Sequence, residues 1–373
     1  MRKIFLLTGL LFSFSILFAQ EPVDAVRFSW LTPQGTARTQ ALGGAIIGLG
    51  GDITALNANP AGLGLYKTSE LVLTPGYTFN NTKSSYRGSS ATDSKSSFNY
   101  GPVGVIWGMP SRSADSKWKN VSIGLSLSKM ADFNSKVYVD GNNNQSSFSE
   151  KYLDQLISGN VTNPDDAATN YPYGASLGIN TYLIDPTYDA NDNLTGYASN
   201  SSVATGVKQQ QNIDSKGSIA DFSMGVGGNY KDVFYVGGSI NINTLKYTRN
   251  SSFREADATS DGNNDFNYFV ADDYLSTDGV GITIKVGVIF KPVDALRVGI
   301  NFHSPSWYTF NDTYNSALTT DTEGYAGVRS QSSLDLNDGY SGEYSYGYNS
   351  PMRVGAGLAY IFGTQEDVSS QKG

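Results

Sequence analysis

The sequence has no cysteine and a single histidine, and each shortage excludes classes of site. Without cysteine, this chain of 373 residues has no disulfide framework, thiolate metal site or cysteine nucleophile. The lone His303 excludes a multi-histidine metal cluster and leaves a Ser/His/Asp triad one candidate base. The stretch "GYSGEYS" around Ser341 and Ser345 is not the Gly-x-Ser-x-Gly nucleophile turn. We therefore expect no enzyme activity, no metal and no cofactor.

Basic stretches and long apolar runs are also scarce. The formal net charge is -8 with no basic stripe, so we expect no nucleic-acid binding. The apolar run 4–18 follows Arg2 and Lys3 and gives way to "AQEP", which is typical of a secretory signal peptide at 1–19, cleaved after Ala19. A membrane anchor is the alternative, but this run is short and interrupted by polar residues, and no later apolar stretch is long enough for a transmembrane helix.

What the chain does have is glycine, aromatic residues and alternation. It contains 41 glycines, 24 tyrosines and 18 phenylalanines. In "GITIKVGVIF" (281–290) the apolar residues alternate with Thr283, Lys285 and Gly287, and "NVSIGLSLSK", "VFYVGGSININ" and "RVGINFH" repeat the pattern. Similar patterns lie at about 71–80, 98–109, 219–230 and 350–362. A period of two with one apolar face predicts about eight half-buried strands.

Alternation is compatible with a soluble β-sandwich as well as with a membrane barrel, and other features favour the barrel. The segments have about the length that a tilted strand needs to cross a bilayer. Aromatic residues gather near their ends, and two connections, 229–233 and 291–295, are tight, whereas about 141–215 and 250–272 are long and polar. Aromatic girdles, short turns on one side and long external loops on the other are typical of outer-membrane barrels.

The two long connections carry local signals of their own. In "SFSEKYLDQLIS", Ser147 and Glu150 have capping-box spacing, while Phe148, Tyr152, Leu156 and Ile157 share one helical face, so we expect a helix in this loop. In "DGNNDFNYFVADD", Asp261, Asn263 and Asp265 have the odd spacing of a calcium loop but lack its glycine at the sixth position. A solvated acidic loop is the better interpretation.

The stretch "GGDITALNANPAGLGLY" (50–66) combines apolar residues with residues that disfavour regular structure. Glycines allow close approach to a wall and turns with positive φ, which we expect at Gly43, Gly44, Gly50 and Gly51. We assign Asp52 to the same turns. Asn57 and Asn59 can bond nearby backbone, and Pro60 fixes a bend. An irregular apolar segment of this kind is tolerated at membrane depth only when protein encloses it.

The run "GTARTQALGGA" (35–45), "GGD" (50–52) and "NPAGLGLY" (59–66) strongly resembles the N-terminal segment of the FadL/TodX family of outer-membrane channels for hydrophobic compounds, and most of all its Bacteroidetes branch. The resemblance implies a 14-stranded antiparallel transmembrane β-barrel plugged by a hatch, here residues 20–66, with 67–373 as barrel. It implies passive uptake of long-chain fatty acids or small aromatic hydrocarbons in the outer membrane of a Gram-negative bacterium. The hatch motif that contacts the wall and gates it would be Asn57, Asn59, Pro60, Ala61 and Gly62.

The remaining expectations concern partners and completeness. Lys285 and Arg297 are expected as charges facing the lumen. The partners would be a hydrophobic small molecule, outer-membrane lipid and the barrel-assembly machinery, with the protein as a monomer. About eight strands are too few for a barrel with room for a hatch, and the end "GTQEDVSSQKG" is polar, so we expect a chain truncated at the C-terminus. The alternative function is an exported β-sandwich or adhesin that binds without transport.

Overall fold

The computed structural model describes residues 22–29, 35–113, 115–201, 203–259, 262 and 264–362. The expected signal peptide and the polar end of the chain after Phe362 lie outside the described residues. The chain divides after Thr32 into two units, and the described part of the first is α2 (Pro22–Ser29). The second unit begins at Pro33, so most of the segment expected as a hatch belongs to the same unit as the strands.

Residues 35–66, called the docked segment below, fold as short helices joined by turns. The helices are α3 (Ala37–Ala41), α4 (Ala55–Ala58) and the 3-10 helix η1 (Pro60–Leu65). The Thr36 hydroxyl caps α3 by accepting a hydrogen bond from the N–H of Thr39 at 3.3 Å. Asn59 caps η1 in the same way from Ala61 at 3.2 Å, and Pro60 follows at the first helical position, where a missing N–H costs little. Local capping therefore explains where these short helices begin.

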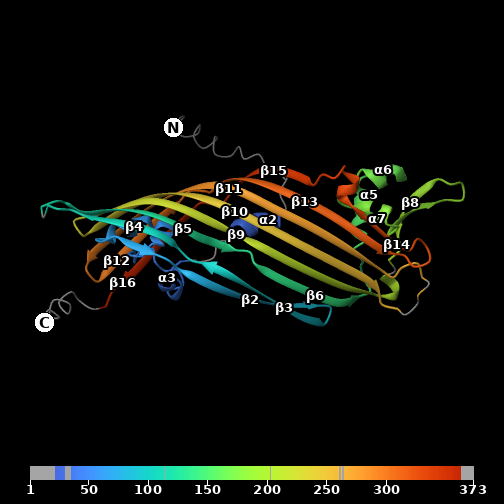
Figure 1. Ribbon diagram of the computed structural model, residues 1–373, viewed down its shortest axis with the longest axis horizontal. Helices are drawn as coiled ribbons and strands as arrows, with labels where there is room; N and C mark the ends of the chain where they lie inside the picture. Colours follow the sequence, from blue (N-terminus) through green and yellow to red (C-terminus); the bar gives the residue numbers. More distant parts are fainter. Residues whose placement is uncertain are drawn as a thin grey trace, which may run out of the picture. The chain divides into compact units, whose positions relative to one another are not determined.

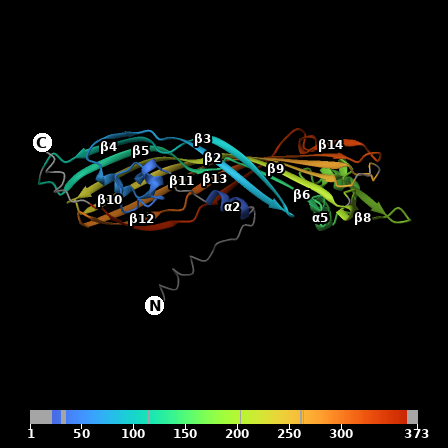
Figure 2. The same cartoon turned by 90° about the horizontal axis from the view of Figure 1, so that it is seen from below.

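The strands form one antiparallel sheet of 12 strands and two separate hairpins (Figure 1, Figure 2). The order along the sheet is β1-β4-β5-β9-β10-β11-β12-β16, with β6 beside β9, β13 beside β11, and β14 and β15 beside β13. The bounds in the sheet are β1 (Glu70–Val72), β4 (Val103–Pro110), β5 (Trp118–Asp132), β6 (Ser135–Asn143), β9 (Val207–Tyr230), β10 (Phe234–Asp257), β11 (Tyr268–Val293), β12 (Leu296–His303), β13 (Trp307–Asp321), β14 (Val328–Ser332), β15 (Gly342–Asn349) and β16 (Arg353–Tyr360). The hairpins are β2 (Pro75–Tyr86) with β3 (Ser89–Tyr100), and β7 (Ile184–Tyr188) with β8 (Leu194–Ser199).

The prediction of an antiparallel all-β chain is confirmed, but the strand count of about eight is wrong. Strands β1 to β16 lie within the described residues, and β9, β10 and β11 run for 24, 24 and 26 residues. These strands extend into both regions expected as loops, so the connections are 144–206 and 258–267 instead of 141–215 and 250–272. The path of the sheet ends at β1 and β16, and no pairing among the described strands closes it into a barrel.

The three long strands β9, β10 and β11 run side by side (Figure 1, Figure 2). Along these strands, the side chains on a given face change from apolar to polar between the two halves. We call 219–230, 234–245 and 279–293 the band half, and 207–218, 246–257 and 268–278 the cap half. Leu245 pairs with both Ile219 and Gly279, so the two halves meet at one level on all three strands. The side chains that face away from the docked segment are apolar and exposed in the band half: Phe222, Met224, Val226, Phe234, Val236, Ile240, Ile242, Val280, Ile282, Ile284, Val286, Val288 and Phe290. We call this set the apolar band.

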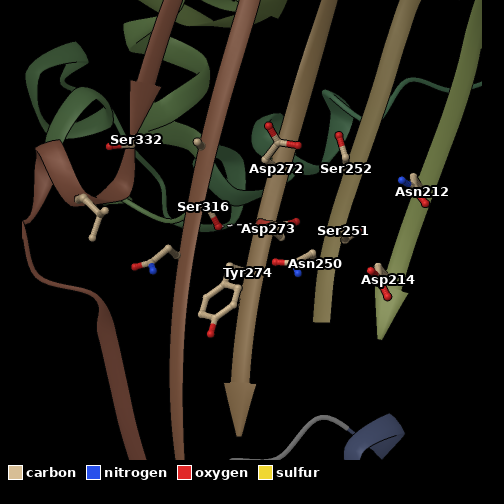
Figure 3. Close-up of a pocket in the computed structure, with 13 residues that line it drawn as sticks. Asn212, Asp214, Asn250, Ser251, Ser252, Asp272, Asp273, Tyr274, Ser316 and Ser332 are labelled. Atoms are coloured by element: carbon tan, nitrogen blue, oxygen red, sulfur yellow. Dashed lines mark hydrogen bonds between the residues drawn. The ribbon is translucent and has the colours of Figure 1, made fainter. Parts of the chain in front are cut away.

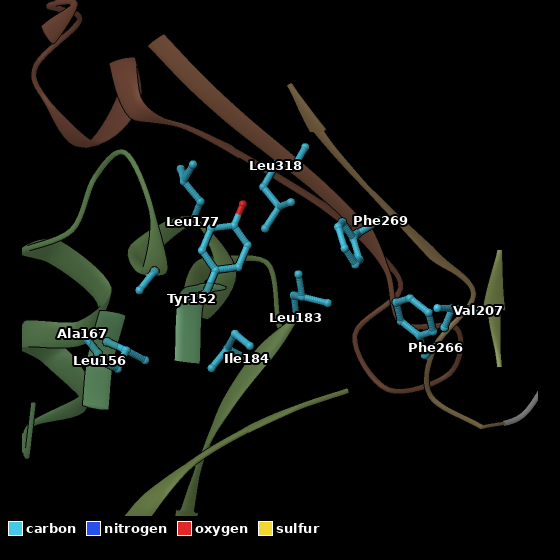
Figure 4. Packing of buried hydrophobic residues seen from close by; sticks show 12 residues of the cluster. Tyr152, Leu156, Ala167, Leu177, Leu183, Ile184, Val207, Phe266, Phe269 and Leu318 are labelled. Atoms are coloured by element: carbon cyan, nitrogen blue, oxygen red, sulfur yellow. The ribbon is translucent and has the colours of Figure 1, made fainter. Parts of the chain in front are cut away.

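The face of the cap half that carries Phe269 and Ala271 is covered by the helical connection between β6 and β9. It contains α5 (Glu150–Ser158), α6 (Pro164–Thr169), α7 (Ala175–Asn180) and the 3-10 turn η2 (Val203–Thr205), while α8 (Ser333–Leu336) follows β14. Tyr152 and Leu156 of α5 are buried in one apolar cluster with Phe269 and Leu318 of the sheet (Figure 4). The expected helix is therefore present, but Ile157 is 68% exposed and does not belong to its buried face.

Two other local expectations need revision. Ser147 does not cap α5 with its hydroxyl, which contacts Ser149 and Glu255 instead, although the Glu150 carboxylate accepts a hydrogen bond from the Ser147 N–H at 3.1 Å. Aromatic residues are expected near the strand ends, but Tyr247 and Tyr308 are buried, whereas Tyr77, Phe79 and Phe98 are exposed. Among the described residues, none of the helices has the length and apolar character needed to cross a membrane.

Candidate functional site

The docked segment lies against the inner face of the band half, and Asn59 connects the two. Its amide nitrogen donates to the carbonyl of Ile47 at 2.7 Å and lies 3.4 Å and 3.5 Å from the carbonyl oxygens of Val288 and Ile300 in the wall. The facing wall residue is Gly287, where a Cβ atom would lie 1.8 Å from the Asn59 Oδ1. Any larger residue at 287 therefore displaces Asn59.

Asn57 enters a buried polar cluster that holds the only fully enclosed ion pair among the described salt bridges. Its Oδ1 accepts from Ser223 at 2.8 Å, from Asn241 at 3.0 Å and from Lys285 Nζ at 3.0 Å. Lys285 also pairs with Asp221 at 3.0 Å, and these two side chains are 5% and 0% exposed. Because an isolated buried charge is very costly, Lys285 and Asp221 depend on each other and on Asn241, and Asn57 adds one further acceptor to the lysine.

Wall side chains bond the backbone carbonyls that the irregular segment cannot satisfy by itself. Asn120 donates to the carbonyls of Gly64 and Tyr66, at 2.9 Å and 2.8 Å, and Ser239 donates to that of Leu56 at 2.9 Å. The carbonyl of Ala58 lies 3.0 Å from the His303 ring nitrogen Nε2 and also accepts from Asn301. This is the backbone satisfaction that an enclosed, glycine-rich segment requires.

Wall glycines allow the segment to approach the strands at backbone distance. A Cβ at Gly237 would lie 2.3 Å from the Pro60 carbonyl oxygen, and one at Gly299 would lie 2.2 Å from that of Ile47. A Cβ at Gly227 would lie 2.7 Å from Leu63 Cβ. These distances are too short for real Cβ contacts, so glycine is required at these wall positions for the segment to dock as it does.

The turns of the docked segment fall at its own glycines. Gly43, Gly44, Gly50 and Gly51 have φ values of 61°, 82°, 59° and 67°, in the left-handed region that favours glycine. Asp52 follows this last turn, and its carboxylate accepts from the Thr54 N–H at 2.8 Å and from the Thr36 hydroxyl at 2.5 Å. Asp52 thus joins the start of α3 to the start of α4.

Apolar contacts complete the interface. Ile53, Leu56 and Leu63 are buried with Tyr66 and with Ile106 of β4 in one cluster. Ala61 packs in a second cluster, with Tyr235 and Ile289 of the wall.

The structure brings the sequence-predicted residues together but changes what two of them do. Asn57, Asn59, Pro60, Ala61 and Gly62 all lie in the interface and are buried. Lys285 and Arg297, expected as charges facing the lumen, contact the docked segment: Lys285 bonds Asn57, and Arg297 Nη1 donates to the Leu49 carbonyl at 2.6 Å. Sequence reasoning missed the wall partners Asn120, Asp221, Ser239, Asn241 and Asn301. The one feature of the sequence that could have indicated these residues is that they lie on the polar face of alternating strands.

The acidic loop between β10 and β11 carries the residues of the calcium interpretation. Asp261 and Asn263, on which the calcium interpretation depends, lie outside the described residues. Within the described ranges, no group of three or more histidine, cysteine, aspartate or glutamate side chains is arranged to hold a metal ion.

The apolar band on the other face has the height of a bilayer core. On β11 it runs from Val280 to Phe290, ten residue steps, or about 34 Å along a strand that rises about 3.4 Å per residue. For the tilt of about 40° usual in barrels, that length spans about 26 Å, close to the ~25 Å band of outer-membrane barrels. At the end next to the short turns, the Phe234 and Phe290 rings stack with centroids 4.9 Å apart.

Comparison with known proteins adds little to this geometry. No protein-family model matches the chain, and no curated protein matches it. Among solved structures, the "CymD monoaromatic hydrocarbon channel" aligns over 88% of this chain and 97% of that chain, with 8% sequence identity and a TM-score of 0.20. A superposition at that TM-score does not establish a shared fold.

Proposed function

We propose that this chain is an outer-membrane channel for hydrophobic compounds, in which the docked segment is the hatch. The observation that carries the proposal is the two-sided band half: an exposed apolar band on one face and a polar, glycine-rich face that holds an irregular segment on the other. A soluble sheet has the opposite arrangement, since it buries its apolar face and exposes its polar one. An apolar face directed to lipid, with polar groups directed inward, is the arrangement of a transmembrane barrel.

The docked segment supports transport more than a purely structural sheet. It fills the polar face with backbone that depends on wall side chains for its hydrogen bonds, so it is a plug that the wall holds in place. Its sequence resembles the hatch of the FadL/TodX family, whose members admit long-chain fatty acids or small aromatic hydrocarbons. Uptake would be passive and would need no cofactor, because partitioning and downhill diffusion supply the driving force.

A channel of this kind requires the sheet to close around the segment. In a bilayer an open sheet edge leaves backbone N–H and C=O groups without partners, so the edges at β1 and β16 must be paired. We propose that the functional form is a closed barrel, located in the outer membrane, inserted by the barrel-assembly machinery and acting as a monomer.

Uptake assays test the proposal. Cells that express the full-length gene are given labelled oleate or labelled toluene, and the accumulation is compared with cells that lack the gene. We expect faster accumulation of at least one compound and a change in rate for Asn59→Ala and Pro60→Ala, which alter the hatch. Gly238→Ala is the matched control, because a Cβ at Gly238 would meet its nearest atom, the Lys285 carbonyl oxygen, at an ordinary 3.6 Å.

The alternative, an exported adhesin without transport, makes the opposite prediction. It requires a protein that stays in solution without detergent and leaves the uptake of both compounds unchanged. If the protein partitions with the outer-membrane fraction but takes up neither compound, the proposed location stands and the transport of these substrates is rejected.

A further inference from the structure

The outer face of the cap half carries a cavity of about 350 Å³ (Figure 3). Its lining residues come from β9, β10, β11, β13 and β14 and from Leu334 of α8, and none of them belongs to the docked segment. A volume near the lower end of known ligand pockets, about 300–1,000 Å³, suits a small ligand. The cavity is therefore distinct from the interface described above.

Strand register arranges the floor of the cavity as two rows across four neighbouring strands. In the first row Asn250 pairs with both Asp214 and Tyr274, and Tyr274 pairs with Asn315. In the second row Ser252 pairs with both Asn212 and Asp272, and Asp272 pairs with Ala317. Figure 3 shows side chains of both rows on adjacent strands. With strands about 4.8 Å apart and about 7 Å between rows, the floor measures roughly 14 by 7 Å.

Several polar groups of this floor have no partner within the protein. The side chains of Asn250, Asp272 and Asn212 make no hydrogen bond to another residue in the part of the chain that the structure describes. Tyr274 is 37% exposed beside them. By contrast, Asp214 is held by Lys95. Amide donors and acceptors, one free carboxylate and an aromatic ring thus face the same cavity.

We propose that this cavity binds a neutral saccharide of roughly two or three rings, a size set by the 14 by 7 Å floor. Carboxylate and amide groups bond neighbouring sugar hydroxyls in pairs, since together they offer donors and acceptors, and the C–H face of a sugar packs on an aromatic ring such as Tyr274. Phosphorylated and carboxylated sugars are disfavoured, because Asp272 is unpaired and the whole chain is acidic.

The position of the cavity indicates where such a saccharide comes from. Tyr274 lies six residues beyond Val280, the last residue of the apolar band on β11, or about 20 Å along the strand. A protein seated in a bilayer by that band holds the cavity beyond the hydrocarbon core, at the level of surface sugars. Both a lipid-linked saccharide of the outer leaflet and a free oligosaccharide can reach it, and the test separates these two sources.

The test measures saccharide binding by the full chain in detergent. The probes are a panel of neutral oligosaccharides of two to four sugars, sialyllactose as an anionic probe, and vesicles with or without lipopolysaccharide. We expect at least one neutral oligosaccharide to bind, sialyllactose not to bind, and Tyr274→Ala or Asp272→Ala to weaken binding at least tenfold. Tyr188→Ala, an exposed tyrosine on β7, is the control and should leave binding unchanged.

Each remaining outcome decides the proposal. Binding of free and lipid-linked saccharide, both lost in Tyr274→Ala, supports the site and a shared ligand. Binding of lipopolysaccharide vesicles that free neutral oligosaccharide competes away assigns the lipid-linked source. The proposal is overturned if no neutral saccharide binds or if both variants bind like the unmodified protein. Asp272→Asn keeps the size and polarity of the side chain and is the control for misfolding. This variant should retain most of the binding.

Discussion

The two halves of β9, β10 and β11 have the same backbone structure but opposite environments. In the band half, Ile284 and Val286 point outward and are exposed, while Lys285 between them is buried against the docked segment. In the cap half, Asp272 and Tyr274 point outward, while Phe269 and Ala271 are buried under helices. The change occurs at one level on all three strands, at the pairing of Leu245 with Ile219 and Gly279. Under the proposed function, this change of sidedness along continuous strands corresponds to a change of solvent, from lipid to water.

The polar partners differ between the halves as well. The band half bonds the backbone of a segment with little regular structure, through side chains such as Asn120 and Ser239. The cap half instead packs apolar side chains on helices whose backbone is satisfied internally. The first interface therefore depends mainly on hydrogen bonds and close backbone approach, and the second combines apolar burial with hydrogen bonds from the connection to Glu255. Substitutions at the two sites should fail in different ways.

Lys285→Met is expected to have the largest effect, because it leaves Asp221 buried without its cation. Removing one partner of a buried ion pair typically costs about 3–5 kcal/mol in free energy of unfolding. Urea unfolding of the protein in lipid vesicles measures the loss. The double variant Lys285→Met with Asp221→Asn should recover much of it, and a double variant as unstable as the single one would contradict the account.

Leu156→Ala tests the cap half alone. Leu156 is 1% exposed in the apolar cluster, so its truncation should cost about 2–5 kcal/mol. The loss should appear as faster hydrogen exchange in α5 and α7 with unchanged exchange in the docked segment. Ile157→Ala is the matched control, since that side chain is 68% exposed and its removal should have almost no effect. Equal destabilisation of the docked segment would show that the two halves are not independent.

Val286→Arg places a charge in the middle of the apolar band. A lipid-facing arginine near the bilayer midplane costs about 2–4 kcal/mol. Ser276→Arg, on the same face of the same strand but in the cap half, should change the free energy of unfolding by less than about 0.5 kcal/mol. If both arginines are tolerated equally in vesicles, the apolar band does not face lipid.

Gly287→Ala is expected to have the smallest effect on stability, about 1–3 kcal/mol for overpacking, but a specific structural consequence. Its Cβ would overlap Asn59 Oδ1, so the docked segment must shift and become more sensitive to protease. Gly238→Ala adds the same methyl group where its nearest contact is ordinary, and should keep the segment protected. Protection that persists in Gly287→Ala would mean that Asn59 is not held at that wall position.

The band half was predictable from the sequence, and the cap half was not. Alternation in 281–290 predicts a strand with one apolar and one polar face, and in the structure β11 has its polar face against the docked segment. The cap half gives no such pattern: "VKQQQNIDSKGS" at the start of β9 is polar on both faces, and such a composition predicts a loop. The outward side chains of the cap half face water and can be of almost any type, while the inward ones pack under the helical cap. The sequence of these strands therefore lacks an apolar period of two.

The site was predictable in one chain segment and not in its partners. The glycines and the Asn57, Asn59 and Pro60 positions are local features, and local chemistry fixes their turns and caps. Lys285 was noticed as a charge, but its partner Asp221 lies 64 residues earlier and comes beside it only through the registers of β9, β10 and β11. Such pairings depend on tertiary structure, which composition and spacing do not contain.

The most direct test of the central claim measures which solvent each half of β11 contacts. Because the chain has no cysteine, single cysteines can be introduced by Ile284→Cys and Ser276→Cys and labelled with a fluorophore in reconstituted vesicles. We predict that lipids with brominated acyl chains quench the label at 284 strongly and the label at 276 hardly at all, while a water-soluble quencher shows the reverse. Equal quenching at the two positions by either quencher would contradict the account.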